Sequence, residues 1–130
     1  MANPNIVNVT SIVGGNLGFN LSSSVTATLL QVDSGQILKI NRITCANVDG
    51  ASAVNLDLFI DGLGSGAAGI TTSGADATVY LAKTISIPPD STLILVDSPI
   101  YLMENDALKG GASAAGDLDL FISYEVLNDA

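Results

Sequence analysis

The 130-residue sequence contains no histidine, no tryptophan and a single cysteine, Cys45. The lack of histidine excludes nucleophilic catalysis with an imidazole base. A protein without histidine and with only one cysteine also lacks the ligands of a tetrahedral zinc site. A lone cysteine cannot form an internal disulfide, so Cys45 is expected to be a small, buried apolar residue. These absences predict a protein that is not an enzyme and that uses no metal and no cofactor.

Positive charge is also scarce. The chain has four Lys and Arg against 13 Asp and Glu, which gives a net charge of -9. This balance opposes contact with phosphates and with anionic membrane surfaces, so neither nucleic acid nor a membrane is an expected partner. Charged residues form 13% of the chain, against about 25% in ordinary globular domains. A surface with so few charges costs little to desolvate, which favours packing against neighbouring subunits.

Long apolar runs and helical periodicity are missing as well. No apolar run approaches the ~20 residues of a bilayer-spanning helix. Short runs in which apolar and polar residues alternate occur throughout, separated by Gly, Pro, Asp and Ser, and this period of two predicts β-strands. The predicted fold class is all-β: one antiparallel β-sandwich over residues 1–130, jelly-roll-like, with an immunoglobulin-like sandwich as the alternative. Residues 1–5 are expected to form an extended N-terminal arm or a frayed terminus.

The clearest strands are predicted at 53–60 and 118–127, where apolar residues occupy alternate positions. In 36–48 the alternation changes phase, which indicates either a β-bulge near Asn41–Arg42 or a strand covered on both faces. Residues 92–96 are apolar at both parities, which is typical of a central strand or of an interface. Further strands are predicted at 6–13, 19–22, 25–32, 78–87 and 100–103.

Turn-forming residues separate these runs. Asp33-Ser34-Gly35 is predicted to close a tight hairpin, with Gly35 at positive φ. Pro88-Pro89-Asp90 ends one strand and leads into the next, because proline cannot donate to a ladder. Residues 61–76 are predicted to form a long surface loop with a short extended piece at 70–72. Residues 109–116 are predicted to form a turn of small residues.

Two pairs of carboxylates, Glu104 with Asp106 and Asp117 with Asp119, have the spacing that places both members on one face of a strand. That geometry would allow acid–base chemistry. Neither an aromatic platform nor a basic group accompanies the pairs in the sequence. Both pairs are therefore predicted to lie at a solvated edge.

The pentapeptide LDLFI occurs twice, at residues 56–60 and 118–122. We interpret the repeat as two strands with the same pattern. In each copy the phenylalanine, Phe59 or Phe121, shares a face with the aspartate and lies opposite the aliphatic residues. Such a ring is either an anchor in an interface with another subunit, where aromatic residues are enriched, or a ring covered by loops of its own chain. The interface is predicted to contain Phe59 and Phe121, together with Ile6, Val7 and Val9 near the N-terminal arm.

Several stretches of the sequence resemble one family. These are MANPNIVNVTSI at 1–12, NVDGASAV at 47–54, IPPDS at 87–91, YLMEND at 101–106 and ISYEVL at 122–127. They are similar to small virion structural proteins of tailed phages, most closely to those of marine cyanobacterial phages. The resemblance rests on turn and core residues and covers most of the chain outside the Gly-rich loop. It implies a particle component without a catalytic site, located on the capsid or in the tail.

The charge of -9 favours the outside of the capsid, since packed DNA would repel such a protein. The expected function is therefore to decorate or cement the outer capsid surface. The expected partners are copies of the chain itself, as a trimer, and the major capsid protein or other virion proteins. One alternative is a tail, baseplate or fibre component. A second is a surface carbohydrate-binding or adhesion module that uses the loop at 61–76.

Overall fold

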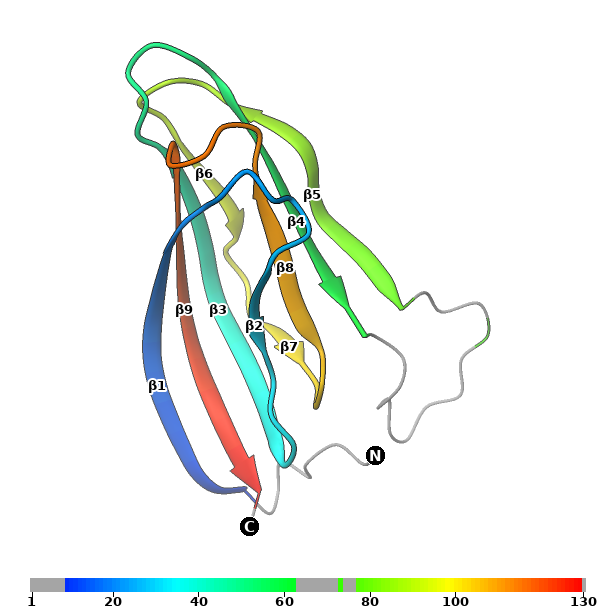
Figure 1. The fold of residues 1–130 in the computed structure, drawn as a ribbon. Coiled ribbons are helices and arrows are strands. Elements are labelled where there is room, and N and C mark those ends of the chain that lie inside the picture. The colour runs from blue at the N-terminus through cyan, green and yellow to red at the C-terminus, as the bar shows by residue number, and fades with distance from the viewer. Residues whose placement is uncertain (1–8, 63–72, 74–76, 130) are drawn as a thin grey trace.

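In the part of the chain that the structure describes, nine antiparallel strands form two sheets that face each other (Figure 1). The computed structural model describes residues 9–62, 73 and 77–129. No helix long and apolar enough to cross a membrane occurs in these ranges. The predicted all-β antiparallel sandwich is confirmed. The strands are β1 (Val9–Asn20), β2 (Thr28–Gln31), β3 (Gln36–Asn47), β4 (Val54–Asp61), β5 (Thr78–Ile87), β6 (Thr92–Val96), β7 (Ile100–Leu102), β8 (Ala107–Ala112) and β9 (Leu118–Asp129).

The order of the strands is that of a jelly roll. Sheet A has the order β1-β9-β3-β6, with β7 also paired to β3, and sheet B has the order β2-β8-β4-β5. Strands β6 and β7 pair with successive parts of β3 and together form one interrupted strand. Apart from β4 with β5, and the two parts β6 and β7 of the interrupted strand, strands that follow one another in sequence therefore lie in opposite sheets. An immunoglobulin-like sandwich keeps more consecutive strands in one sheet, so the jelly-roll prediction is confirmed over that alternative.

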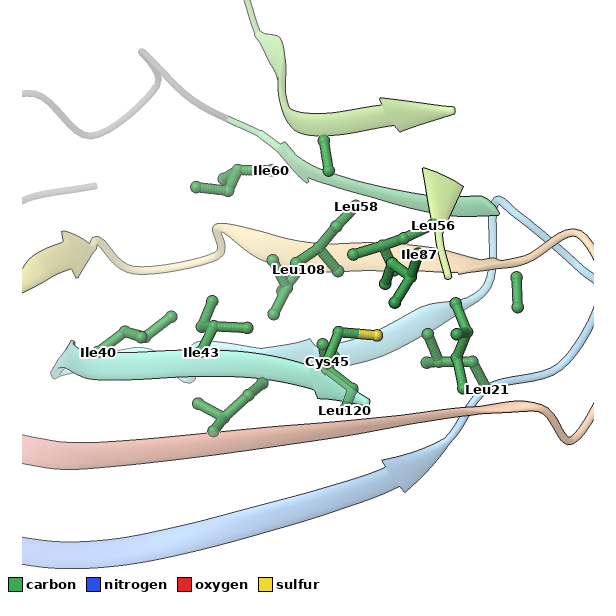
Figure 2. Close-up of a cluster of buried hydrophobic side chains, with 14 of the residues drawn as sticks. Leu21, Ile40, Ile43, Cys45, Leu56, Leu58, Ile60, Ile87, Leu108 and Leu120 are labelled. Atoms are coloured by element: carbon green, nitrogen blue, oxygen red, sulfur yellow. The ribbon is translucent and has the colours of Figure 1, made fainter. Parts of the chain in front are cut away.

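The core lies between the two sheets (Figure 2). Leu56, Leu58 and Leu108 from sheet B meet Ile43 and Leu120 from sheet A, and all five side chains are buried. Truncating one such residue to alanine typically costs about 2–5 kcal/mol, because lost burial and the remaining cavity both destabilise the fold.

Cys45 is a free cysteine within this core, as the sequence predicts. Burial raises the pKa of the Cys45 thiol to about 11, and the nearby charge of Asp119 adds to the effect. The thiol is therefore protonated and unreactive at neutral pH.

The predicted bulge in β3 is present. The register of β3 against β9 shifts between Ile40 and Arg42. Because Asn41 is the extra residue, the two apolar pairs of opposite parity reach the same side of the sheet. Leu38, Ile40, Ile43 and Cys45 are all buried in the core.

Two predicted turns have other roles in the structure. Gly35 has a φ of 77°, as expected, but Asp33-Ser34-Gly35 does not close a hairpin. The strands that it joins, β2 and β3, belong to different sheets, so the turn carries the chain across the sandwich. The segment predicted as a turn at 109–116 contains most of β8, a central strand of sheet B. That part of the prediction was wrong.

The glycines of β8 explain the error. A Cβ at Gly110 would collide with the backbone oxygen of Asp57 in β4, and a Cβ at Gly111 would collide with the backbone oxygen of Ser24. Small residues occur here because backbones approach β8 closely on both sides. The sequence alone shows the glycines but does not show these neighbours.

Other boundaries also differ from the predictions. The separate strands predicted at 6–13 and 19–22 are one strand, β1, from its first described residue, Val9, to Asn20. Strand β2 is shorter than the predicted 25–32. Strand β6 ends sheet A, so 92–96 is not the central strand that one interpretation required. Residues 1–5, with the predicted arm, and the extended piece at 70–72 lie outside the described residues, as does most of the predicted loop.

Candidate assembly surface

The outer face of sheet A carries an exposed phenylalanine in a setting of small residues. Phe121 of β9 pairs with Gly18 of β1 on one side and with Thr44 of β3 on the other. Directly paired residues of an antiparallel ladder project from the same face. Gly18 has no side chain, and a Cβ built there would meet nothing within 4 Å. The ring of Phe121 is consequently 45% exposed.

The same row continues to the edge of the sheet. Thr44 pairs with Ile94 of β6, and the side chain of Ile94 is exposed. Two outward-facing rows further along sheet A, the exposed Tyr101 of β7 pairs with Lys39 of β3. We call Phe121, Ile94 and Tyr101 the sheet A patch. All three are exposed side chains that are apolar or aromatic.

Charge on this face is partly neutralised within the chain. Lys39 Nζ lies 3.9 Å from Glu125 Oε2, and these two residues are paired across β3 and β9. Asn20 Nδ2 donates a 2.7 Å hydrogen bond to Asp119 Oδ1 across β1 and β9. Arg42, which pairs with Ser123 between these rows, is exposed and forms no ion pair within the described residues. A partner that covers the patch would therefore need an acidic or polar group opposite Arg42.

Phe59 lies in a different environment from Phe121. It is only 6% exposed, because Tyr80 of the neighbouring strand β5 covers it, with the ring centroids 4.9 Å apart. Lys83 Nζ in turn lies 4.5 Å from the centroid of the Tyr80 ring. A neighbouring strand of the same chain thus contributes to the burial of Phe59. Alternation in 78–87 does not reveal this contact, because the register shift between Leu58 and Phe59 places Tyr80 and Ala82, which have the same parity, on opposite faces.

Of the other predicted interface residues, Val9 is half-buried at the start of β1. Ile6 and Val7 lie outside the described residues. The interface role of all five residues, Phe59 and Phe121 included, stays a prediction.

A polar cluster occupies the outer face of sheet B. Lys109 Nζ donates to Asp61 Oδ2 at 2.8 Å, and the Thr78 hydroxyl donates to Asp61 Oδ1 at 2.8 Å. The hydrogen bond from Lys109 and that from Thr78 hold the pKa of Asp61 below its usual value. The charges are satisfied within the cluster. No group of three or more His, Cys, Asp or Glu that could hold a metal ion occurs in the described part of the chain.

The carboxylates Glu104 and Asp106 are buried, so the prediction of a solvated edge was wrong for this pair. They flank a turn in which the Asp106 N–H donates to the Met103 carbonyl at 3.1 Å and the Met103 N–H donates to Asp106 Oδ2 at 2.9 Å. The positive φ of Asn105, 67°, completes the turn. Backbone hydrogen bonds from this turn to Val32 hold the end of β2 against it.

Each of these two carboxylates keeps one buried oxygen without a hydrogen bond from the described residues, Glu104 Oε2 and Asp106 Oδ1. Burial raises the pKa of Asp106. Neither group forms an ion pair within the described ranges. We assign the pair a structural role at the turn, since no basic or nucleophilic group accompanies it there.

No family model and no curated protein matches the chain. Among solved structures, a pentameric capsid protein isolated from metagenomic phage sequences has 16% identity and a TM-score of 0.33, with 95% of this chain and 62% of that one covered. The VP2 subviral particle of infectious bursal disease virus has 17% identity and a TM-score of 0.38, with 89% and 31% covered. The chain thus spans less than two thirds of either protein. TM-scores this low do not establish a shared fold, so the jelly-roll assignment rests on the strand order.

Proposed function

We propose that this chain is a non-enzymatic structural protein of a phage particle and that it decorates or cements the outer surface of the capsid. The observation that carries the proposal is the sheet A patch. An exposed phenylalanine with glycine and threonine beside it offers an anchor that a partner surface can bury. Aromatic side chains in such positions contribute much of the binding energy of protein interfaces.

The fold is compatible with this role but does not select it. Jelly rolls occur in viral capsid proteins, and also in lectins and other proteins. The resemblance of the sequence to phage virion proteins supports the particle. The net charge of -9 supports the outside of the shell, where the protein is kept from packed DNA. Binding at many equivalent sites lets each copy stabilise a shell by mass action even when each contact is modest.

The proposed partners are copies of the chain itself and the major capsid protein or another virion protein. A trimer is the proposed homo-oligomer. Part of the sheet A patch would then be buried between copies or against the shell. Its three exposed apolar or aromatic side chains suit either use.

Electron microscopy of particles that carry the protein, with gold-labelled antibodies against it, tests the location. Label spread over the shell is the expected result. Label confined to tails, with a bare shell, would contradict the capsid proposal and favour a tail, baseplate or fibre component. A monomer that binds specific sugars on a glycan array would favour the carbohydrate-binding alternative.

A pair of variants tests the patch itself. Phe121→Ser is expected to weaken the binding of the purified protein to capsid shells from which this protein is absent. Ile85→Ser is the matched control, because Ile85 is 40% exposed on β5 of the opposite sheet. Equal binding by both variants and the wild type would show that the patch does not contact the shell.

A further inference from the structure

Strand β1 is a long, uncharged strand at the edge of sheet A. It contains twelve residues, of which none is charged and none is proline. It pairs with β9 on one side, and no other described strand pairs with its second side (Figure 1). Such an edge presents a row of backbone N–H and C=O groups that can pair with another strand.

The other three sheet edges are protected in ways that β1 is not. Strand β2 has only four residues and β6 only five. Strand β5 has ten, but it carries Lys83, a positive φ of 51° at Thr84, and register shifts against β4. Short length, charge and bulges are the features that keep edge strands from pairing. The single irregularity of β1 lies at its start, between Val9 and Ser11.

Two apolar side chains of β1 are exposed on opposite faces. Ile12 is 62% exposed on the outer face, and Val13 is 55% exposed on the inner face. The inner position of Val13 follows from its pairing with Val126, which packs against the core. On the same side of the sandwich, Leu17, Leu30 and Tyr124 line an apolar cleft of about 140 Å³, which we call the edge cleft.

We propose that β1 pairs antiparallel with β1 of a second copy, so that sheet A continues across a two-fold axis. The inference rests on the proposed function in one respect, because it takes the chain to be present in many copies. The β1 strand of a second copy is itself uncharged, extended and of the same length, so it can pair along the whole free edge of β1. Each copy has a net charge of -9, so contact through the charge-free strand minimises repulsion between copies. A two-fold axis makes the contact self-complementary and closed.

The side chains select one register, in which Gly15 lies opposite Gly15 of the second copy. Val13 then faces Leu17 of the second copy, which places its side chain at that copy's edge cleft. Ile12 faces Gly18 of the second copy, where the structure leaves open space for a side chain. Phe121 lies on the far side of that glycine. The register therefore covers both exposed apolar residues of β1 and extends the sheet A patch into the second copy.

The first test compares the mass of the purified full chain with that of two lysine variants by sedimentation velocity. The β1 contact joins two copies or, where the proposed trimer forms through another surface, two trimers. Ile12→Lys adds a charge to this contact and is expected to halve the mass of the assembly. Ile85→Lys is the matched control and is expected to keep the wild-type mass, since Ile85 is an exposed isoleucine on the other long edge strand. If Ile12→Lys does not fold, Asn16→Lys, at an exposed polar position of β1, takes its place. An unchanged mass in a folded β1 variant, or a monomeric wild type, would overturn the pairing.

The second test addresses the register. Ile12→Cys and Gly18→Cys chains are mixed and oxidised, and a disulfide between chains is expected in the mixture but not in either variant alone. The native Cys45 is buried and does not compete. Cross-links within one variant alone would overturn this register. If the chains pair in solution but microscopy finds the shell unlabelled, the result counts against the proposed function only. If the shell is labelled but the purified protein is monomeric, the result overturns only the pairing.

Discussion

The ring of Phe59 packs against the ring of Tyr80, with centroids 4.9 Å apart and planes inclined by 36°. We therefore expect Phe59→Ala to lower the free energy of unfolding by about 3 kcal/mol, because it removes a buried ring and its aromatic contact. Urea denaturation measures the loss. The mass of the folded fraction is expected to stay that of the wild type. A normal unfolding curve with reduced assembly would place Phe59 in an interface instead.

Phe121→Ala is expected to give the opposite result. The exposed ring contributes little to folding, so the unfolding midpoint should hardly change. Assembly or shell binding should weaken by about 2 kcal/mol, which is roughly a 30-fold change in affinity. Titration of the fluorescently labelled variant against shells or against unlabelled copies measures it. A large loss of stability without loss of affinity would mean that Phe121 serves the fold alone.

Gly111→Ala tests the close approach around β8. The added methyl would collide with the backbone oxygen of Ser24, so we expect a loss of at least about 2 kcal/mol in the free energy of unfolding. Gly14→Ala is the control, because a Cβ at Gly14 in β1 meets nothing within 4 Å. The control should be neutral or slightly stabilising. Similar unfolding midpoints for the two variants would contradict the packing described for β8.

Asp106→Asn tests the buried turn through its pH dependence. Burial raises the pKa of Asp106 in the folded state above 3.8. The folded state therefore keeps a proton that the unfolded state releases, and this contribution to stability falls as the pH rises from 3.8 through the folded pKa. Asparagine keeps an acceptor for the Met103 N–H and cannot ionise.

The stability of Asp106→Asn relative to the wild type should consequently increase as the pH rises through that window. Thermal unfolding between pH 3 and pH 8 measures the difference. Asp61→Asn should show the opposite trend, because the pKa of Asp61 is lowered by Lys109 and its contribution is lost as the pH falls. A pH-independent difference for Asp106→Asn would show that its carboxyl has the same pKa folded and unfolded.

Local patterns predicted those parts of the fold that local chemistry decides. The bulge at Asn41 could be predicted because Leu38 and Ile40 have one parity while Ile43 and Cys45 have the other. The positive φ of Gly35 could be predicted from its place in a turn. The destination of the next strand could not, because the same turn serves a hairpin within a sheet or a crossing between sheets. Strand β8 was missed because close backbone contact requires glycines that otherwise indicate a turn.

The candidate surface shows the same limit. Phe59 and Phe121 occupy identical pentapeptides, so no local signal separates them. Their environments differ through residues distant in sequence: Tyr80 covers Phe59, whereas Gly18 and Thr44 leave Phe121 open. Likewise, the burial of Asp106 depends on packing around the turn, which the spacing of carboxylates does not reveal.

The position of β9 also sets the timing of folding. This last strand lies between β1 and β3 in sheet A, and its ladder with β1 joins Val9 to Asp129. On the ribosome, β1 and β3 have no common neighbour until the end of β9 has emerged, so sheet A can close only after the residues from β1 to β9 have been made. Contacts so distant in sequence make folding slow. During that interval both sides of β1 are unpaired, and nascent chains held close together at this stage would be prone to aggregate.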